Sequence, residues 1–138
     1  MLARRNPRDL YRSVDFDARV TGADPRALVG ICFEQVNVSL GAALRAFENG
    51  DNALKSRSVT RAVAAITALQ LGVDPAAPIA PVLLQFYEAA RTSLLDCVPN
   101  FDRHKIAEIR KDFSEISSAF GDVFPISGPV REQTYFTV

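Results

Sequence analysis

The segment from Val20 to Phe47 combines a sharp helix start with apolar side chains that cover most of the predicted helix. Asp24 can cap this helix, and Pro25 suits its first position, where a missing N–H costs nothing. One stripe of apolar residues then follows the helical repeat: Val29, Phe33, Val36, Leu40, Leu44 and Phe47. Much of the remaining circumference is occupied by Leu28, Ile31, Cys32, Val38 and Ala42. Such a helix is buried on several sides or binds a partner.

Three further helical segments follow, and turn-forming residues end each of them. The predicted helices span residues 25–48, 55–71, 79–97 and 102–120. The turn signals between and after them are Asn49–Gly50, Gly72, Val98–Pro99–Asn100 and Gly121. Because short connections make consecutive helices run in opposite directions, the sequence predicts an all-α fold, an antiparallel four-helix bundle.

The chain is predicted to form one domain with an extension at each end. Its 138 residues suffice for a core that needs neither disulfides nor a metal. We expect an N-terminal arm with a short helix at 1–23, the bundle at 24–121 and an extended tail at 122–138. The tail is apolar although it has two prolines and no amphipathic repeat. Either it packs on the bundle or something else covers it.

The composition argues against several classes of partner. Sixteen basic and sixteen acidic residues balance, so no overall charge attracts nucleic acid. No apolar run approaches the ~20 residues of a membrane helix and no signal-peptide core is found, so we expect no membrane insertion and a cytoplasmic location. Cys32 and Cys97 fall on apolar helix faces, which favours buried reduced thiols over a disulfide.

The only histidine, His104, lies near the start of the fourth predicted helix. A phosphotransfer bundle would carry such a histidine, but here Lys105 follows it directly and no small residue comes before Ala107. This context favours an exposed polar residue in a first helical turn. The sequence contains no Glu-x-x-His pair for a metal bundle and no phosphate-binding glycine loop. We therefore expect neither an enzyme nor a cofactor.

The first and third helices carry more apolar residues than a bundle core needs. The main stripe of the third helix comprises Val82, Leu83, Phe86, Ala90, Leu94 and Cys97, and beside it lie Leu84, Tyr87 and Leu95. This surplus indicates a groove for a partner, or burial beneath the two apolar ends of the same chain. Gly30 and Gly41, inside the first helix, indicate close approach of another helix or of a partner, because an interior glycine costs ~1 kcal/mol relative to alanine.

Four motifs occur in an order and spacing that resemble a known family. They are Tyr11 within DLYRSV, VTGADPRALVGICFEQ from Val20, TRAVAAITAL from Thr60 and LLQFYEAARTSLLDC from Leu83. Together they resemble the flagellin-specific export chaperones of the FliS family over residues 10–120. Gln35 and Val36 stand where the family commonly has a glycine, and Phe120 replaces a usual tryptophan, so the resemblance is to a divergent member.

The resemblance implies an all-helical chaperone for the C-terminal region of newly made flagellin. In this family that region is disordered before export and folds into helices on the chaperone, which prevents premature polymerisation and delivers flagellin to the flagellar export apparatus. We expect the client on the first and third helices and part of the second. The expected partner-binding residues are Tyr11, Val14, Phe16, Leu28, Ala65, Ala68, Leu84, Tyr87 and Leu95. Two alternatives are a histidine phosphotransfer or signalling bundle using His104, and a helical adaptor for another flagellar protein.

Overall fold

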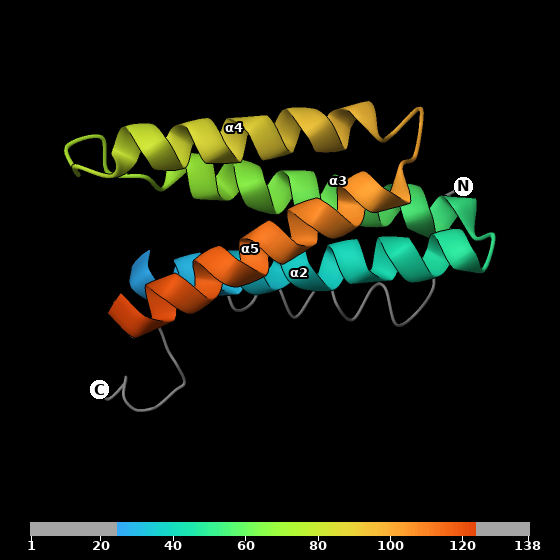
Figure 1. Ribbon diagram of the computed structural model, residues 1–138, viewed down its shortest axis with the longest axis horizontal. Helices are drawn as coiled ribbons and strands as arrows, with labels where there is room; N and C mark the ends of the chain where they lie inside the picture. The colour runs from blue at the N-terminus through green and yellow to red at the C-terminus, as the bar shows by residue number, and fades with distance from the viewer. Residues whose placement is uncertain (1–24, 124–138) are drawn as a thin grey trace.

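A computed structural model describes residues 25–123 of the chain as four helices (Figure 1). They are α2 (Pro25–Glu48), α3 (Asn52–Leu71), α4 (Ala80–Asp96) and α5 (Arg103–Val123). No strand occurs among these residues, so the predicted all-α fold is confirmed. The predicted arm, and the tail beyond Val123, lie outside the described residues. α5 continues two residues past Gly121, which was expected to end it.

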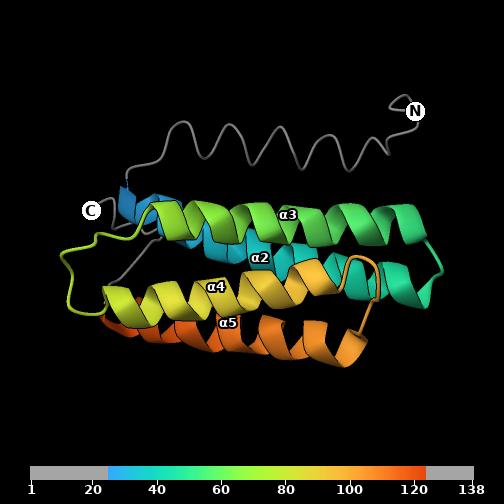
Figure 2. The ribbon, with the colours of Figure 1, turned by 90° about the horizontal axis from the view of Figure 1, so that it is seen from above.

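The helices run antiparallel in sequence order, and each of them has two neighbours (Figures 1 and 2). α2 packs most extensively on α3 and also packs on α5, while α3 packs on α4. α4 and α5 touch only sparingly, and Figure 1 shows α5 crossing away from α4 after the short connection between them. The backbones of α2 and α4 lie diagonally across the core and are not neighbours.

Capping explains where α2 ends and α3 begins. Gly50 takes a left-handed conformation with φ 72°, which lets the Asp51 N–H donate to the Ala46 carbonyl at 2.8 Å and closes α2. The Asp51 carboxylate then accepts from the Leu54 N–H at 3.1 Å. This N-cap starts α3 at Asn52, earlier than the predicted residue 55, because an aspartate at this position supplies the acceptor that a first helical turn needs.

The end of α3, both ends of α4 and the start of α5 follow the predicted turns. Gly72 ends α3 in a right-handed conformation with φ −87°, so its role there does not depend on a left-handed backbone. Asp74 forms a turn by accepting from the Ala76 N–H at 3.0 Å, and Pro81 lies in the first turn of α4. Asp102 caps α5 by accepting from the N–H groups of His104 and Lys105 at 3.0 and 3.2 Å.

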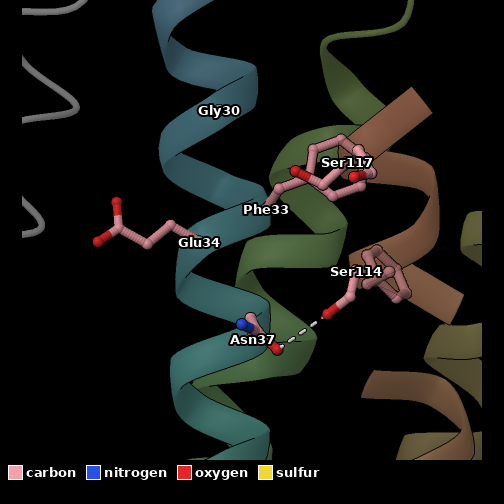
Figure 3. A pocket seen from close by; sticks show the side chains of 8 residues that line it. Gly30, Phe33, Glu34, Asn37, Ser114 and Ser117 are labelled. Carbon is pink, nitrogen blue, oxygen red and sulfur yellow. Dashed lines mark hydrogen bonds between the residues drawn. The ribbon is translucent and has the colours of Figure 1, made fainter. Parts of the chain in front are cut away.

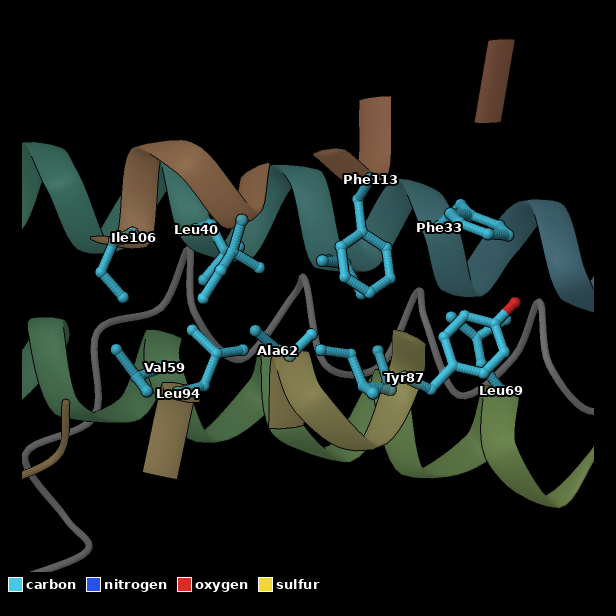
Figure 4. Packing of buried hydrophobic residues seen from close by; sticks show 14 of the residues in the cluster. Phe33, Leu40, Val59, Ala62, Leu69, Tyr87, Leu94, Ile106 and Phe113 are labelled. Carbon is cyan, nitrogen blue, oxygen red and sulfur yellow. The ribbon is translucent and has the colours of Figure 1, made fainter. Parts of the chain in front are cut away.

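The core runs along the centre of the bundle and is aromatic at one end (Figure 4). Its largest fully buried side chains include Tyr87, Phe113, Leu40, Ile66, Leu94 and Ile106. Phe113 packs on Phe86 and Phe33, with ring centroids 4.9 and 5.7 Å apart. Burial of Ile106, Ile109 and Phe113 confirms the predicted inward face of α5.

The inward face of α4 differs from the predicted stripe. Tyr87 is only 2% exposed and belongs to the core, whereas Val82, which was assigned to the core, is 64% exposed. The reason is that α4 packs mainly on α3 and hardly on α5, so its buried arc is centred on Ala80, Tyr87 and Leu94. Because α4 has apolar residues on both flanks, its sequence does not determine which side of the helix faces the core.

Small side chains line the closely packed interface between α2 and α3. From α3 they include Ser58, Ala62 and Ala65, and from α2 they include Ser39, Ala43 and Ala46; all six are buried. Within each helix they recur every three or four residues and so share one face. This face lets the two backbones approach closely. The Ser58 hydroxyl is buried there without a hydrogen-bond partner in the described structure.

By length and composition alone, Ala27–Glu48 of α2 could cross a membrane, contrary to the expectation from the sequence. The same helix is the central core helix of the bundle. Val36, Leu40 and Ala43 are completely buried against the rest of the protein. Its apolar composition is therefore explained by packing against the neighbouring helices.

Candidate partner-binding surface

The structure places the predicted binding residues of α2 and α3 in different environments. Leu28 is partly buried against the core, Ala65 is fully buried between α2 and α3, and Ala68 is exposed on the outer side of α3. Tyr11, Val14 and Phe16 lie outside the described residues. Ala65 is therefore inaccessible to a partner in this conformation, because it is buried in the core of the bundle.

The predicted residues of α4 divide between the core and the surface. Leu84 and Leu95 are 38% and 43% exposed, whereas Tyr87 is buried. Leu84, Glu88, Arg91 and Leu95 follow a four-three-four spacing and so share one face of α4. That face borders α3, as its hydrogen bonds show.

A polar network crosses the seam between α3 and α4, between the two exposed leucines. The Gln70 amide donates to Glu88 at 2.8 Å, and the Arg91 guanidinium donates to the Thr67 hydroxyl at 3.3 Å. Arg91 also lies 3.6 Å from the Glu88 carboxylate. Leu84 and Leu95 therefore form two separate apolar contacts on either side of a polar bridge, rather than one continuous groove.

The predicted residues of the first and third helices cannot line a groove between those two helices alone. The reason is topological, because α2 and α4 lie diagonally and no shared groove can form between their backbones. The surplus of apolar residues could be read from the sequence, but the pairing of the helices could not. A partner that contacts both helices has to pass over α3 or α5.

The most exposed large apolar side chains lie where α3 ends and α4 begins, a region that the site prediction did not include. Leu71 is 83% exposed, Val82 is 64% exposed and Ile79 is 51% exposed. The sequence signal was the apolar run between Gly72 and Leu84, which is interrupted by three prolines. This end of the bundle offers a second apolar contact surface.

A pocket of about 370 Å³ opens between α2 and α5 (Figure 3). Its described lining consists of Gly30, Phe33, Glu34, Asn37, Phe113, Ser114, Ser117 and Ser118. The two phenylalanines belong to the buried core, so they supply an apolar floor. The other lining residues are small or polar. None of these residues was among the predicted binding residues.

Hydrogen bonds fix the side chains at one end of this pocket. Arg110 Nε donates to both the carbonyl and the side-chain oxygen of Asn37, at 3.0 and 2.9 Å. The Ser114 hydroxyl donates to the same side-chain oxygen at 3.3 Å. Gly41 leaves room for the arginine, because a Cβ atom there would lie 2.8 Å from its terminal nitrogen. The close approach predicted at Gly41 is therefore made by a side chain of α5.

At the opposite end of the bundle, a cation–aromatic cluster joins two connections. Phe47 stacks on Phe101 with ring centroids 4.8 Å apart. Lys55 Nζ lies 5.6 Å from the Phe47 centroid and 5.0 Å from that of Phe101. The cluster ties the α2–α3 turn to the α4–α5 connection. Phe47 continues the apolar stripe of α2 but remains partly exposed, because its ring packs in this cluster at the bundle end.

Comparison with known families identifies the chain's relatives. The family described as Flagellar protein FliS matches residues 7–127, a range that includes all four described helices. The chain belongs to the FliS family. No curated protein matches it significantly. The match confirms the resemblance inferred from the four motifs and assigns the chain, at family level, to the flagellar export chaperones.

The buried thiols and the buried phenol of this FliS protein have a structural role in the core. Cys32 and Cys97 are free and buried, as predicted, and burial raises the pKa of the Cys32 thiol. Burial, with a smaller contribution from Cys32, raises the pKa of Tyr87 to about 12. A thiol and a phenol with raised pKa values stay protonated at neutral pH, so neither is activated as a nucleophile.

His104 is exposed in the first turn of α5, as the sequence context indicated. Its backbone N–H is held by the Asp102 cap, while its side chain is on the surface. Across residues 25–123, His, Cys, Asp and Glu side chains form no cluster suited to a metal ion. FliS is a family of chaperones rather than of enzymes.

Proposed function

We propose that this protein is a cytoplasmic export chaperone for the C-terminal region of flagellin. It would hold that region before export, prevent premature polymerisation and deliver it to the flagellar export apparatus. The observation that carries the proposal is the FliS match over residues 7–127. Binding needs no catalysis and no cofactor, because the client changes only its conformation and location.

The distribution of exposed apolar side chains supports a client that extends over several faces of the bundle. Leu28, Ala68, Leu84 and Leu95 are accessible or partly accessible, and we propose that they contact the client directly. Ala65 and Tyr87 would support that surface from beneath. Tyr11, Val14 and Phe16 are proposed to flank the same surface. Separate contacts suit a segment that folds while it binds, because each new turn can find its own apolar site.

Coupled folding also accounts for a complex that can be released. Ordering a disordered segment opposes the gain from apolar contact, which limits the net affinity even when a large area is buried. A chaperone must release its client for secretion, so moderate affinity over a large surface is an advantage. The proposed interaction should therefore show the negative heat-capacity change of apolar burial.

The test is calorimetry with the isolated C-terminal segment of a flagellin from the same genome. Binding with a negative heat-capacity change supports the proposal, and no binding by any such flagellin contradicts it. Replacing Leu84 and Leu95 together by serine should weaken binding by about tenfold or more, because both lose apolar contact area. A matched variant with Leu71 and Val82 replaced by serine removes similar side chains at the bundle end. If only that variant weakens binding, the client lies at the bundle end instead.

A further inference from the structure

The pocket between α2 and α5 combines features that the proposed apolar contacts lack. It has an apolar floor, polar edges and an open side (Figure 3). We propose that it binds the main chain of the client, with Asn37 donating a hydrogen bond to a client carbonyl. This inference rests on the proposed function and adds a site at which the client is recognised by its backbone.

The orientation of the Asn37 amide follows from its partners. Arg110 Nε can only donate, so the Asn37 side-chain atom that it meets at 2.9 Å must be the oxygen. The Ser114 hydroxyl lies on the same oxygen, as the dashed line in Figure 3 shows. The amide nitrogen therefore points the other way (Figure 3), and its two N–H groups make no hydrogen bond within the described structure. Asn37 is thus presented to a ligand as a donor.

The pocket walls are low enough for a polypeptide backbone to enter. Gly30 has no side chain, and Ser114, Ser117 and Ser118 have short ones. Short side chains let a client backbone come within hydrogen-bonding distance of Asn37, because no long side chain stands between them. The hydroxyls of Ser117 and Ser118 form no hydrogen bond with described residues and can donate or accept.

The charges near the pocket favour a neutral acceptor over an anion. Glu34 lines the pocket, but Figure 3 shows its carboxylate pointing away from Ser114 and Ser117, so the described lining directs no charged group into the pocket. The Arg110 guanidinium is directed toward Asn37 and Gly41 and is not among the lining residues. A peptide carbonyl satisfies the Asn37 donor without added charge. Recognition of the backbone would also let the chaperone accept clients of differing sequence.

The decisive variant is Asn37→Asp, which keeps the shape and the acceptor oxygen for Arg110 and Ser114 but removes the N–H donor. Calorimetry with the flagellin C-terminal segment should show affinity at least about tenfold lower than for the wild type, since a hydrogen bond becomes an acceptor–acceptor contact. Asn100→Asp, at an exposed position in the α4–α5 connection, is the matched control for the added charge. It should bind as the wild type does.

A second variant tests the pocket without changing charge. Ser117→Leu would fill the space above Phe33 and Phe113, and it should lower affinity by a similar factor while circular dichroism shows an unchanged helix content. If Asn37→Asp and Ser117→Leu both fold and bind like the Asn100→Asp control, the pocket assignment is overturned while the chaperone function stands. If the wild type does not bind the segment, the proposed function fails and the inference fails with it.

An alanine scan of the flagellin segment separates backbone recognition from side-chain recognition. If Asn37 binds a carbonyl, the Asn37→Asp loss should persist in every alanine variant of the client. If one alanine substitution abolishes the difference between wild type and Asn37→Asp, the donor binds that client side chain and the backbone assignment is wrong.

Discussion

The interface between α2 and α3 is made of small side chains, whereas the seam between α4 and α5 is filled by large aromatic ones. Ala43 and Ala62 allow two backbones to lie close together along their whole length. Between α4 and α5 the backbones diverge, and Phe86, Tyr87 and Phe113 occupy the space instead. A larger side chain should destabilise the α2–α3 interface, and a smaller side chain should destabilise the α4–α5 seam.

The largest effect is expected where an aromatic filler is removed. Phe113→Ala should lower the free energy of unfolding by about 3–5 kcal/mol, because the cavity cannot collapse between diverging helices. Denaturant unfolding measures this loss. His104→Ala on the same helix is the control, and its exposed side chain should cost within about 0.5 kcal/mol. Equal losses in the two variants would show that the faces of α5 are misassigned.

The second effect concerns the buried phenol of Tyr87 at alkaline pH. Its pKa is raised to about 12 in the folded protein, above the usual value of 10.0, so the unfolded chain loses the proton first as pH rises. The corresponding stability is fully present below pH 10 and is lost between about pH 10 and 12, for a total of about 2–3 kcal/mol.

Tyr87→Phe should remove this part of the alkaline destabilisation. Other groups also titrate in that range, so the informative quantity is the difference between wild type and variant across the pH series, measured by urea unfolding. If the difference in free energy of unfolding between wild type and variant is constant from pH 8 to pH 12, burial does not oppose ionisation of the Tyr87 phenol.

Overpacking of the α2–α3 interface should give the next largest loss. Ala62→Leu adds volume at a completely buried position between two closely spaced backbones and should cost about 1–3 kcal/mol. Ala64→Leu, two residues along on the exposed side of α3, should change stability by no more than about 0.5 kcal/mol. Thermal unfolding of the pair measures the contrast, and a tolerated leucine at position 62 would show that the interface is looser than described.

This contrast also explains how much the sequence could predict. Three- and four-residue spacing correctly identified the helices and the inner face of α5, because charged residues surround Phe113 there on both flanks. The same spacing misplaced Tyr87. α4 is apolar on both sides, so the side that faces the core depends on which neighbouring helix lies closer. Helix pairing is set by the bundle as a whole.

The pocket at Asn37 could not be predicted for a related reason. Asn37 and Ser114 are far apart in the chain and meet only because α2 and α5 are neighbours. A lone asparagine in an apolar helix carries no distinguishing local signal. Gly30 and Gly41 were the hints, since an interior glycine indicates a close approach, but the sequence left open whether another helix or a partner makes it.

The smallest predicted effect isolates the contact between Gly41 and Arg110. Alanine at position 41 should favour the helix by ~1 kcal/mol, but its Cβ would lie 2.8 Å from the guanidinium and displace a side chain that holds Asn37. The two effects oppose each other in the wild-type background, so Gly41→Ala alone should leave stability unchanged or slightly reduced. In an Arg110→Ala background the clash is absent, and the same substitution should stabilise by ~1 kcal/mol. A double-mutant cycle by urea unfolding should therefore give a coupling of about 1 kcal/mol between the two positions. Simple additivity would mean that the arginine moves aside freely, and that the Asn37 amide is not held in the orientation on which backbone recognition depends.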